Sequence, residues 1–175
     1  ANGDVYTGAF VDGASTGDGT YTFAASGNVY TGAFVDGART GEGTFTWANG
    51  NVYTGAFVDN ARTGEGTFTW ANGDVYTGAF VDGASTGEGT YTFAASGDVY
   101  TGAFVDDART GEGTYTFAAS GNVYTGAFVD GANTGEGTFT WANGDVYTGA
   151  FVDNARTGEG TYTFAASGNV YTGAF

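Results

Sequence analysis

Eight residue types are missing from this 175-residue chain: Leu, Ile, Met, Pro, His, Cys, Lys and Gln. Without Cys or His there can be no disulfide, no thiolate or imidazole metal site, and no His-based triad or Cys nucleophile. The lack of Pro, together with the lack of a three-residue Gly period, excludes collagen and polyproline rods. The remaining carboxylates and tyrosines recur in nearly identical surroundings, whereas a catalytic site needs one distinct environment. We therefore predict no enzyme, no cofactor and no metal site.

Positive charge is almost absent. The chain has 19 acidic residues against four Arg, so its net charge is −15. Nucleic acids and anionic membrane surfaces attract clustered cations, so we expect no nucleic acid partner and no binding to anionic membranes. The sequence shows no apolar run long enough to span a bilayer and no leader of the basic-then-apolar kind, so we expect a soluble protein. Its compartment stays open, with an extracellular or cell-surface location slightly favoured.

Internal repetition dominates the sequence. The segment G-[DN]-V-Y-T-G-A-F recurs at intervals of 23 or 24 residues, beginning at Gly3, Gly27, Gly50, Gly73, Gly97, Gly121, Gly144 and Gly168. Low aliphatic content and high acidic charge would alone indicate disorder, but this regularity is typical of a repeat architecture. We predict a single repeat array over residues 1–175, with seven full units and a partial eighth. The near identity of the units suits a consensus design as well as a natural array.

Each unit has the alternating pattern of two β-strands. In residues 5–11, Tyr6, Gly8 and Phe10 share one face, and the residues between them point to the other face. Thr20 to Ala24 alternates in the same way, in residue types that favour strands. Each unit therefore predicts a β-hairpin.

The connections are rich in Gly. We interpret residues 12–19 as a loop and Asn49-Gly50 as a two-residue hairpin turn. On that interpretation every acidic residue lies in a loop or at a strand end, and no charge lies inside a strand. The strand Phe-Thr-Trp always precedes the shorter connection Ala-Asn-Gly, whereas Tyr-Thr-Phe precedes Ala-Ala-Ser-Gly. This association indicates either packing of the larger ring under the shorter turn or shuffling of two whole modules.

The 30 aromatic residues occupy four fixed positions in each unit. If both strands of a hairpin turn their rings to one side, that side of the sheet is a continuous aromatic ladder with a notch at Gly8 and its equivalents. A chain without Leu or Ile must build its core from these rings, and we prefer this interpretation to a cofactor or sugar site. The predicted ladder begins with Tyr6, Phe10, Tyr21, Phe23, Tyr30, Phe34, Phe45 and Trp47.

The second unit carries the frame Y-x-G-x-F, then D-G-x-x-x-G-x-G, then an aromatic strand and a Gly before the next Tyr. These residues are Tyr30, Gly32, Phe34, Asp36, Gly37, Gly41, Gly43, Phe45, Trp47 and Gly50. The frame resembles the MORN repeat over essentially the whole chain, although Asn60, Asp107 and Asn154 replace the loop Gly. The resemblance implies an elongated, twisted single-layer sheet that acts in protein association and scaffolding, with lipid binding proposed for some members.

We therefore predict an all-β fold, an elongated single-layer antiparallel sheet of tandem β-hairpins with about 15 strands. Its second face is small and neutral, and we expect the chain to associate with copies of itself, as a homo-oligomer or filament, sideways through this face, end to end through its terminal strands, or both; another protein is the second choice of partner. The predicted association face comprises Val5, Thr7, Ala9, Val11, Thr20 and Thr22. The terminal strands carry no Pro, Lys or inward charge that would block pairing. They are the second predicted route to assembly, through Val5, Tyr6, Thr7, Val170, Tyr171 and Thr172.

Three other functions remain as alternatives. The Thr-x-Thr rows, such as Thr20 and Thr22, could order water as an ice-binding surface. The carboxylates Asp36 and Glu42 could bind Ca²⁺, although we favour a solubilising role. Lipid binding of the kind proposed for some MORN proteins would need cations that these strands lack.

Overall fold

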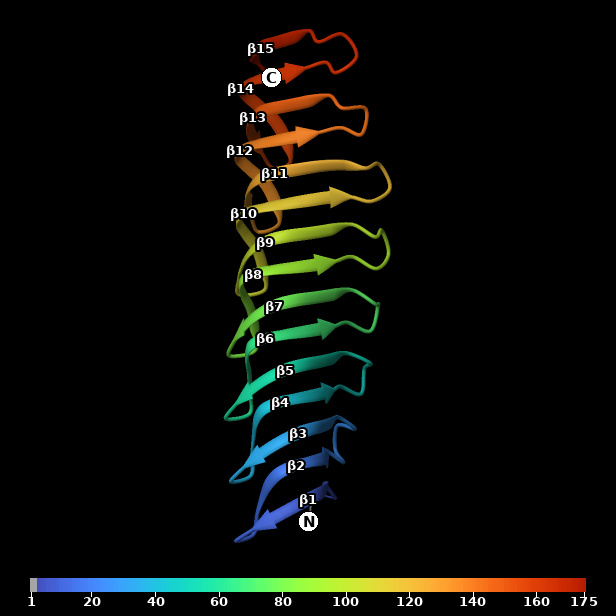
Figure 1. Cartoon of the computed structure of the whole chain (residues 1–175), viewed down its shortest axis with the longest axis vertical. Coiled ribbons are helices and arrows are strands. Elements are labelled where there is room, and N and C mark those ends of the chain that lie inside the picture. The colour runs from blue at the N-terminus through green and yellow to red at the C-terminus, as the bar shows by residue number, and fades with distance from the viewer. Residues whose placement is uncertain (1–2) are drawn as a thin grey trace. The chain divides into compact units, whose positions relative to one another are not determined.

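The computed structural model describes residues 3–175, and the regular elements of this range are all β-strands. They form one open antiparallel sheet in which the order of the strands is the order of the chain, as the sequence predicted (Figure 1). None of residues 3–175 lies in a helix long and apolar enough to cross a bilayer. The strands are β1 (Val5–Val11), β2 (Ala14–Thr22), β3 (Val29–Val35), β4 (Ala38–Thr46), β5 (Val52–Val58), β6 (Ala61–Thr69), β7 (Val75–Val81), β8 (Ala84–Thr92), β9 (Val99–Val105), β10 (Ala108–Phe117), β11 (Asn122–Val129), β12 (Ala132–Thr140), β13 (Val146–Val152), β14 (Ala155–Thr163) and β15 (Val170–Ala174).

The chain divides into two compact halves, an N-terminal half that ends at Ser85 and a C-terminal half that begins at Thr86. The N-terminal half contains β1 to β7, and the C-terminal half contains β9 to β15. That the units form a single array remains a prediction.

The turn inside each unit is much tighter than predicted. Asp12 and Gly13 join β1 to β2 with φ angles of 49° and 83°, the two left-handed residues of a type I′ turn. The prediction of a loop over residues 12–19 was therefore wrong, since a type I′ turn matches the twist of both strands and lets them begin at once. Asn60, Asp107 and Asn154 fit the second turn position with φ between 67° and 72°, a conformation that Asn and Asp tolerate.

The second strand is correspondingly longer than predicted. It covers Ala14–Thr22 rather than Thr20 to Ala24, and its nine residues face seven in β1. The pairing passes from Gly8 opposite Gly19 to Ala9 opposite Thr16, which leaves Gly17 and Asp18 as a bulge. The prediction that no charge lies inside a strand was therefore also wrong. Asp18, its six Glu equivalents and all four Arg lie within strands.

The connections between units differ in length as the sequence indicated, but the shorter one holds three residues rather than two. The Trp47 N–H donates to the Asn51 carbonyl at 2.9 Å, so Ala48, Asn49 and Gly50 form the loop, and Gly50 has φ 93°. The longer form, residues 24–27, is closed by the Phe23 N–H, which donates to the Asn28 carbonyl at 2.9 Å. The ring centroids of Trp47 and Phe68 are 5.3 Å apart, against 5.8 Å for Phe23 and Phe45. The larger ring thus lies closer to the next unit where the connection is shorter.

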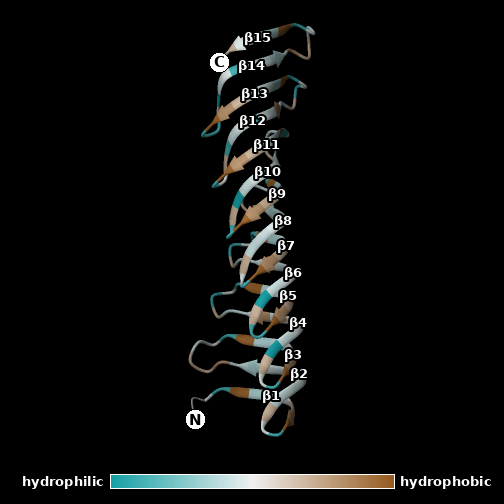
Figure 2. Cartoon of the chain, turned by 90° about the vertical axis from the view of Figure 1, so that its left-hand side faces the viewer, coloured by the Kyte–Doolittle hydropathy of each residue, from teal (hydrophilic) through white to brown (hydrophobic). Residues whose placement is uncertain are grey.

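The two faces of each strand differ sharply in burial. In β5, Tyr53 and Phe57 are buried, whereas Val58 is 54% exposed. We call the face of Tyr53, Gly55 and Phe57 the inner face and the opposite face the outer face, here and in all other units. In Figure 2, hydrophobic residues mark β11 and β13 of the C-terminal half, strands of the same type. The inner face is therefore the core of the protein.

Candidate interaction surfaces

A pair of glycines in each unit makes room for one tyrosine on the inner face. Gly55 on β5 pairs with Gly66 on β6, and the ring of Tyr53 lies over both. A Cβ atom on Gly66 would lie 2.6 Å from the Tyr53 hydroxyl oxygen, and one on Gly55 would lie 2.8 Å from it. The hydroxyl donates to the Ala56 carbonyl at 3.0 Å. Tyr53 thus covers the notch from its own strand, whereas the sequence predicted that rings from neighbouring strands would cover it.

These tyrosines and the phenylalanines of the same strands form what we call the first aromatic row. Tyr30 contacts Phe34 of its own strand and Phe57 of the next unit edge to face, with ring centroids 5.1 and 5.0 Å apart. In the N-terminal half the row is Phe10, Tyr6, Phe34, Tyr30, Phe57, Tyr53, Phe80 and Tyr76. In the C-terminal half it is Phe104, Tyr100, Phe128, Tyr124, Phe151, Tyr147, Phe175 and Tyr171.

A second aromatic row lies at the C-terminal ends of the even-numbered strands and on the residues that directly follow them, and its rings are tilted rather than perpendicular. It runs through Tyr21, Phe23, Phe45, Trp47, Phe68 and Trp70 in the N-terminal half. In the C-terminal half it runs through Tyr91, Phe93, Tyr115, Phe117, Phe139, Trp141, Tyr162 and Phe164. The aromatic residues thus form two rows in each half, where the sequence predicted a single ladder.

Arginine side chains lie between the two rows. The guanidinium carbon of Arg39 is 5.9 Å from the Phe23 ring centroid, 5.6 Å from Tyr30, 5.1 Å from Phe45 and 5.8 Å from Phe57. Arg62 lies over the four equivalent rings at 5.1 to 5.6 Å. Arg109 and Arg156 repeat the arrangement in the C-terminal half. Each Arg therefore fills a box of rings, which we call an aromatic box, through cation–π contacts.

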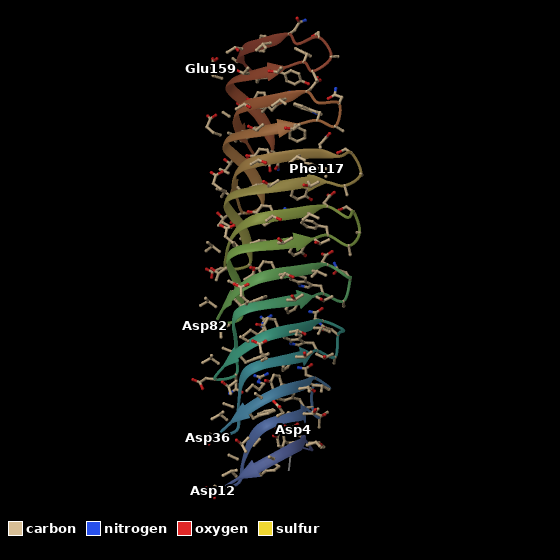
Figure 3. All side chains as sticks on the ribbon, in the orientation of Figure 1. Asp4, Asp12, Asp36, Asp82, Phe117 and Glu159 are labelled. Carbon is tan, nitrogen blue, oxygen red and sulfur yellow. The ribbon has the colours of Figure 1, made fainter. Side chains whose placement is uncertain are left out.

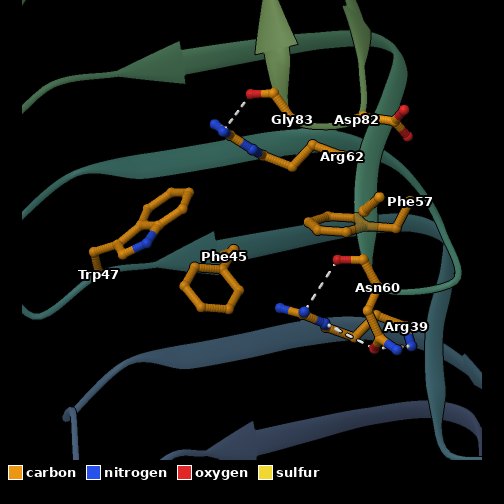
Figure 4. A pocket seen from close by; sticks show the side chains of 9 residues that line it. Arg39, Phe45, Trp47, Phe57, Asn60, Arg62, Asp82 and Gly83 are labelled. Carbon is orange, nitrogen blue, oxygen red and sulfur yellow. Dashed lines mark hydrogen bonds between the residues drawn. The ribbon is translucent and has the colours of Figure 1, made fainter.

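The following type I′ turn fixes the guanidinium groups of Arg39 and Arg62. Asn60 Oδ1 accepts from the Arg39 backbone N–H at 3.0 Å and from Nε at 3.2 Å, while Nη2 donates to the Asn60 carbonyl at 3.0 Å. Arg62 donates to the Gly83 carbonyl in the same way (Figure 4). A hollow of about 280 Å³ lies beside both side chains and is lined by Phe45, Trp47 and Phe57. Burial among the rings lowers the pKa of Arg39.

Sequence reasoning missed these arginines, although the signal was present. Counting back from Phe45 by twos reaches Gly43, Gly41 and Arg39, so the period of a strand places Arg39 on the face of Phe45. The period was not extended that far because these residues were interpreted as a loop.

Sequence reasoning also missed a set of hydrogen bonds that joins the connections of neighbouring units. Asp98 Oδ1 accepts from the Ala118 N–H at 2.8 Å, and Oδ2 accepts from the Tyr115 hydroxyl at 2.9 Å. In the unit that follows, Asn122 Oδ1 accepts from the Ala142 N–H at 3.0 Å, and Phe139 replaces the Tyr. The backbone bond needs one side-chain oxygen, and only the Tyr hydroxyl needs a second acceptor. The sequence obeys this rule in all seven units. Asp4, Asp74, Asp98 and Asp145 accompany Tyr21, Tyr91, Tyr115 and Tyr162, and Asn28, Asn51 and Asn122 accompany Phe45, Phe68 and Phe139.

This pairing predicts a measurable coupling. The bond from the Ala118 N–H, with a smaller effect from the Tyr115 hydroxyl, lowers the pKa of Asp98. The carboxylate therefore stabilises the fold above its unfolded pKa, and this contribution disappears as the pH falls through the folded pKa. We expect Asp98→Asn and Tyr115→Phe each to lower the free energy of unfolding. The double variant, which recreates the natural Asn–Phe pair, should lose less than the sum by about 1 kcal/mol. Urea unfolding of the four proteins measures this coupling, and strictly additive losses would contradict it.

The outer face carries three kinds of side chain in rows. The valine row, which ends each odd-numbered strand from β1 to β13, is 53 to 61% exposed and comprises Val11, Val35, Val58, Val81, Val105, Val129 and Val152. The carboxylate row lies in mid-strand and is also exposed, and it comprises Asp18, Glu42, Glu65, Glu88, Glu112, Glu136 and Glu159. Thr44 and Thr54 belong to a row of cross-strand Thr pairs, and their hydroxyl oxygens are 3.1 Å apart. The outer face is thus an apolar and hydroxyl surface crossed by negative charge.

A second set of carboxylates borders the outer face. Asp12, Asp36 and Asp82 occupy the first position of type I′ turns, and Figure 3 shows all three at one long edge of the N-terminal half. These side chains are exposed, as is Asp59 at the equivalent turn. The valine row therefore lies between two lines of negative charge.

The residues of the predicted association face lie where the sequence placed them. Val5, Thr7, Ala9 and Val11 are exposed, whereas Thr20 and Thr22 are half-buried. The predicted edge residues belong to β1 and β15, the first and last strands in the sheet order. Phe10, which we assigned to the core ladder, is 59% exposed because β1 has only β2 beside it. Tyr21, Phe23 and Trp47 are half-buried, and the other predicted ladder residues in later strands are buried.

Asp36 and Glu42, the residues considered above as Ca²⁺ ligands, lie on different elements. Within residues 3–175, no three His, Cys, Asp or Glu side chains lie together in a way that could hold a metal ion. Asp36 lies on a turn and Glu42 in the middle of β4.

Comparison with known proteins identifies the family of this repeat. The MORN repeat family matches residues 6–27, 30–52, 53–75, 76–97, 100–121, 124–146 and 147–168. No curated protein is similar enough to count as a match. Among solved structures, the TCP domain of Drosophila melanogaster SAS-4, in complex with a proline-rich motif of Ana2, is similar with a TM-score of 0.56 and 14% identity over 90% of this chain and 84% of that one. The G-box domain of the microcephaly protein CPAP is similar with a TM-score of 0.46 and 12% identity over 97% of both chains. The likeness to the SAS-4 domain concerns the fold.

Proposed function

This chain belongs to the MORN repeat family, a structural or binding repeat rather than an enzymatic one, and we propose that it is a scaffold that docks a second copy of itself through its outer face. The observation that supports this proposal is the valine row, which repeats one exposed apolar side chain at every unit. Repetition multiplies a weak contact, because each further pair forms within an association already made. The inner face is a poorer candidate, since its own rings and arginines fill most of it.

Charge sets the conditions for this association. The carboxylate row and the turn aspartates flank the valine row, so two copies with a net charge of −15 each repel one another. Salt shortens the range of this repulsion from about 10 Å at 0.1 M to about 3 Å at 1 M. Apolar contacts are not weakened by such screening, so salt should promote association.

Sedimentation equilibrium of the whole chain tests the proposal. We expect a larger associated fraction at about 1 M than at about 0.05 M NaCl. The quadruple variant V35T/V58T/V105T/V129T should associate at least tenfold more weakly, since exchanging a methyl for a hydroxyl removes roughly 1 kcal/mol of apolar burial per docked site. The matched control A25S/A95S/A119S/A166S changes four exposed residues of the connections and should associate like the parent.

The proposal is wrong if the parent chain stays monomeric at every salt concentration, or if the valine and control variants behave alike. Because the valines are exposed, their replacement should leave unfolding within about 0.5 kcal/mol of the parent, so a lost association would not reflect lost folding.

Ice binding is a second candidate, for which the Thr pairs are the favourable observation. Seven pairs recur on the outer face with oxygen separations of 3.1 to 3.3 Å, so nearly the same hydroxyl spacing is repeated from unit to unit. Thermal hysteresis of the same samples would support this function, and its absence would remove it. We do not propose binding to anionic lipids, because each of the four Arg is engaged with aromatic rings on the inner face.

A further inference from the structure

One position of the repeat holds Arg in some units and a small polar residue in the others. The position that holds Arg39 is Ser15, Arg39, Arg62, Ser85, Arg109, Asn133 and Arg156 in successive units. Asn133 is the informative case, because it lies inside the C-terminal half between complete neighbouring units. The side chain of Asn133 is 8% exposed and is much shorter than Arg.

The rings around Asn133 keep the geometry of a filled aromatic box. Phe117 and Phe139, the rings equivalent to Phe23 and Phe45, are 5.9 Å apart, against 5.8 Å in the box of Arg39. Tyr124 and Phe151 are 4.9 Å apart, against 5.0 Å for the equivalent Tyr30 and Phe57. The box is therefore preformed in the absence of its guanidinium, so a ligand would not need to reorganise it.

The hydrogen-bond acceptor of the Arg39 box is present as well. Asn60 holds Arg39 through its side-chain oxygen and its carbonyl. Asn154 stands at the equivalent turn position after Asn133, and its Oδ1 accepts from the Asn133 backbone N–H at 2.9 Å. Box, turn and acceptor are thus those of an arginine site, and only the arginine is replaced.

Space and polarity at this position agree with an open site. A hollow of about 320 Å³ is lined by Phe117, Asn133, Phe139 and Asn154, and it extends to Arg109 and its own ring partner Tyr115. Burial, with a further effect from Glu112, raises the pKa of Tyr124 to about 12, and no Arg counteracts this shift as Arg109 does at Tyr100. Arg109 is the cation on this lining, and it occupies its own aromatic box, 5.3 to 5.5 Å from the ring centroids of Phe93, Tyr100 and Tyr115.

We propose that the box at Asn133 binds the guanidinium group of an arginine side chain supplied by a partner protein. The four arginines of this chain identify the ligand, since they occupy boxes of the same frame at 5.1 to 5.9 Å from the ring centroids. The net charge of −15 attracts basic segments to the chain. Arginine fits better than lysine, because a planar guanidinium stacks on rings and can donate to both oxygens of Asn154.

The experiment uses the full chain with one open box. The starting protein for this test, called the parent here, carries Ser15→Arg and Ser85→Arg. Asn133 is then the one position of this kind that does not hold Arg. Isothermal titration with the peptide Ac-Gly-Arg-Gly-NH₂ should then give one site, with a dissociation constant on the order of millimolar for a single side chain. The peptide with citrulline in place of Arg has the same shape without the charge, and it should bind at least tenfold more weakly.

Variants at Asn133 decide the location of the site. Asn133→Arg should fill the box and abolish binding, whereas Asn133→Ser keeps it open and should bind like the parent. Equal binding by the citrulline peptide, or undiminished binding by the Asn133→Arg variant, would overturn the proposal. Circular dichroism of each variant verifies folding. The titration is done at low salt, where the chain is expected to be monomeric, so its result is independent of the association proposed for the outer face.

Discussion

Raising the pH from about 9 to about 12 should unfold this protein cooperatively, because the inner face buries tyrosine hydroxyls that would have to ionise. Burial raises the pKa of Tyr53, Tyr100 and Tyr124 to about 12, and the three side chains are fully buried. Since each folded pKa lies above the unfolded value near 10, the stabilisation is complete below about pH 10 and disappears as the pH rises to about 12. We expect a loss on the order of 2 kcal/mol for each ring.

Tyrosinate absorbance and circular dichroism, recorded on the same samples, measure this transition. Ionisation and unfolding should coincide. In the variant Y53F/Y100F/Y124F the unfolding midpoint should move to higher pH, although the variant is less stable at neutral pH because it lacks hydrogen bonds such as that from Tyr53 to the Ala56 carbonyl. Ionisation of most tyrosines near pH 10 with the fold intact would show that these hydroxyls are not buried.

Replacing Gly66 by Ala should destabilise the N-terminal half by about 3 kcal/mol. The new Cβ would lie 2.6 Å from the Tyr53 ring, which cannot move away without breaking the hydrogen bond from its hydroxyl to the Ala56 carbonyl. The effect is steric, since Gly66 has an ordinary strand conformation. Urea unfolding monitored by circular dichroism gives the difference in free energy.

Gly64 on the same strand provides the matched control. A Cβ atom there would meet only Ala56, at an ordinary 3.4 Å, although φ is 62°. Gly64→Ala should therefore cost only the backbone strain of a left-handed residue, about 1 kcal/mol. Equal losses for the two variants would mean that backbone conformation, rather than the Tyr53 ring, determines the need for glycine.

Much of the fold could be predicted because this sequence repeats its pattern with few exceptions. Alternation in Val5 to Val11 gave the first strand and its faces, and the fixed positions of the aromatic residues gave the core side. Both depend on local periodicity, which is written in consecutive residues. The frame around Tyr30 and Phe34 then gave the family resemblance that the comparison confirmed.

The features that were not predicted depend on turn geometry and on contacts between units. Asp36 and Gly37 both adopt left-handed φ, as Asp12 and Gly13 do in the first unit, so β4 begins at Ala38 and includes Arg39 and Glu42. Once the Gly-rich stretch was interpreted as a loop, neither the aromatic boxes nor the carboxylate row could be seen. The pairing of Asp98 with Tyr115 spans 17 residues, and only a comparison of all seven units would have revealed it.

Hydroxyl-radical footprinting of the whole chain, below and above the concentration at which it associates, is the most direct test of the division between a filled inner face and a docking outer face. We predict that Val35, Val58 and Val129 are oxidised in the dilute sample and protected in the concentrated one, while Tyr53 and Tyr124 are protected in both. Protection that appears on the inner-face rings while the valines remain oxidised would contradict the account.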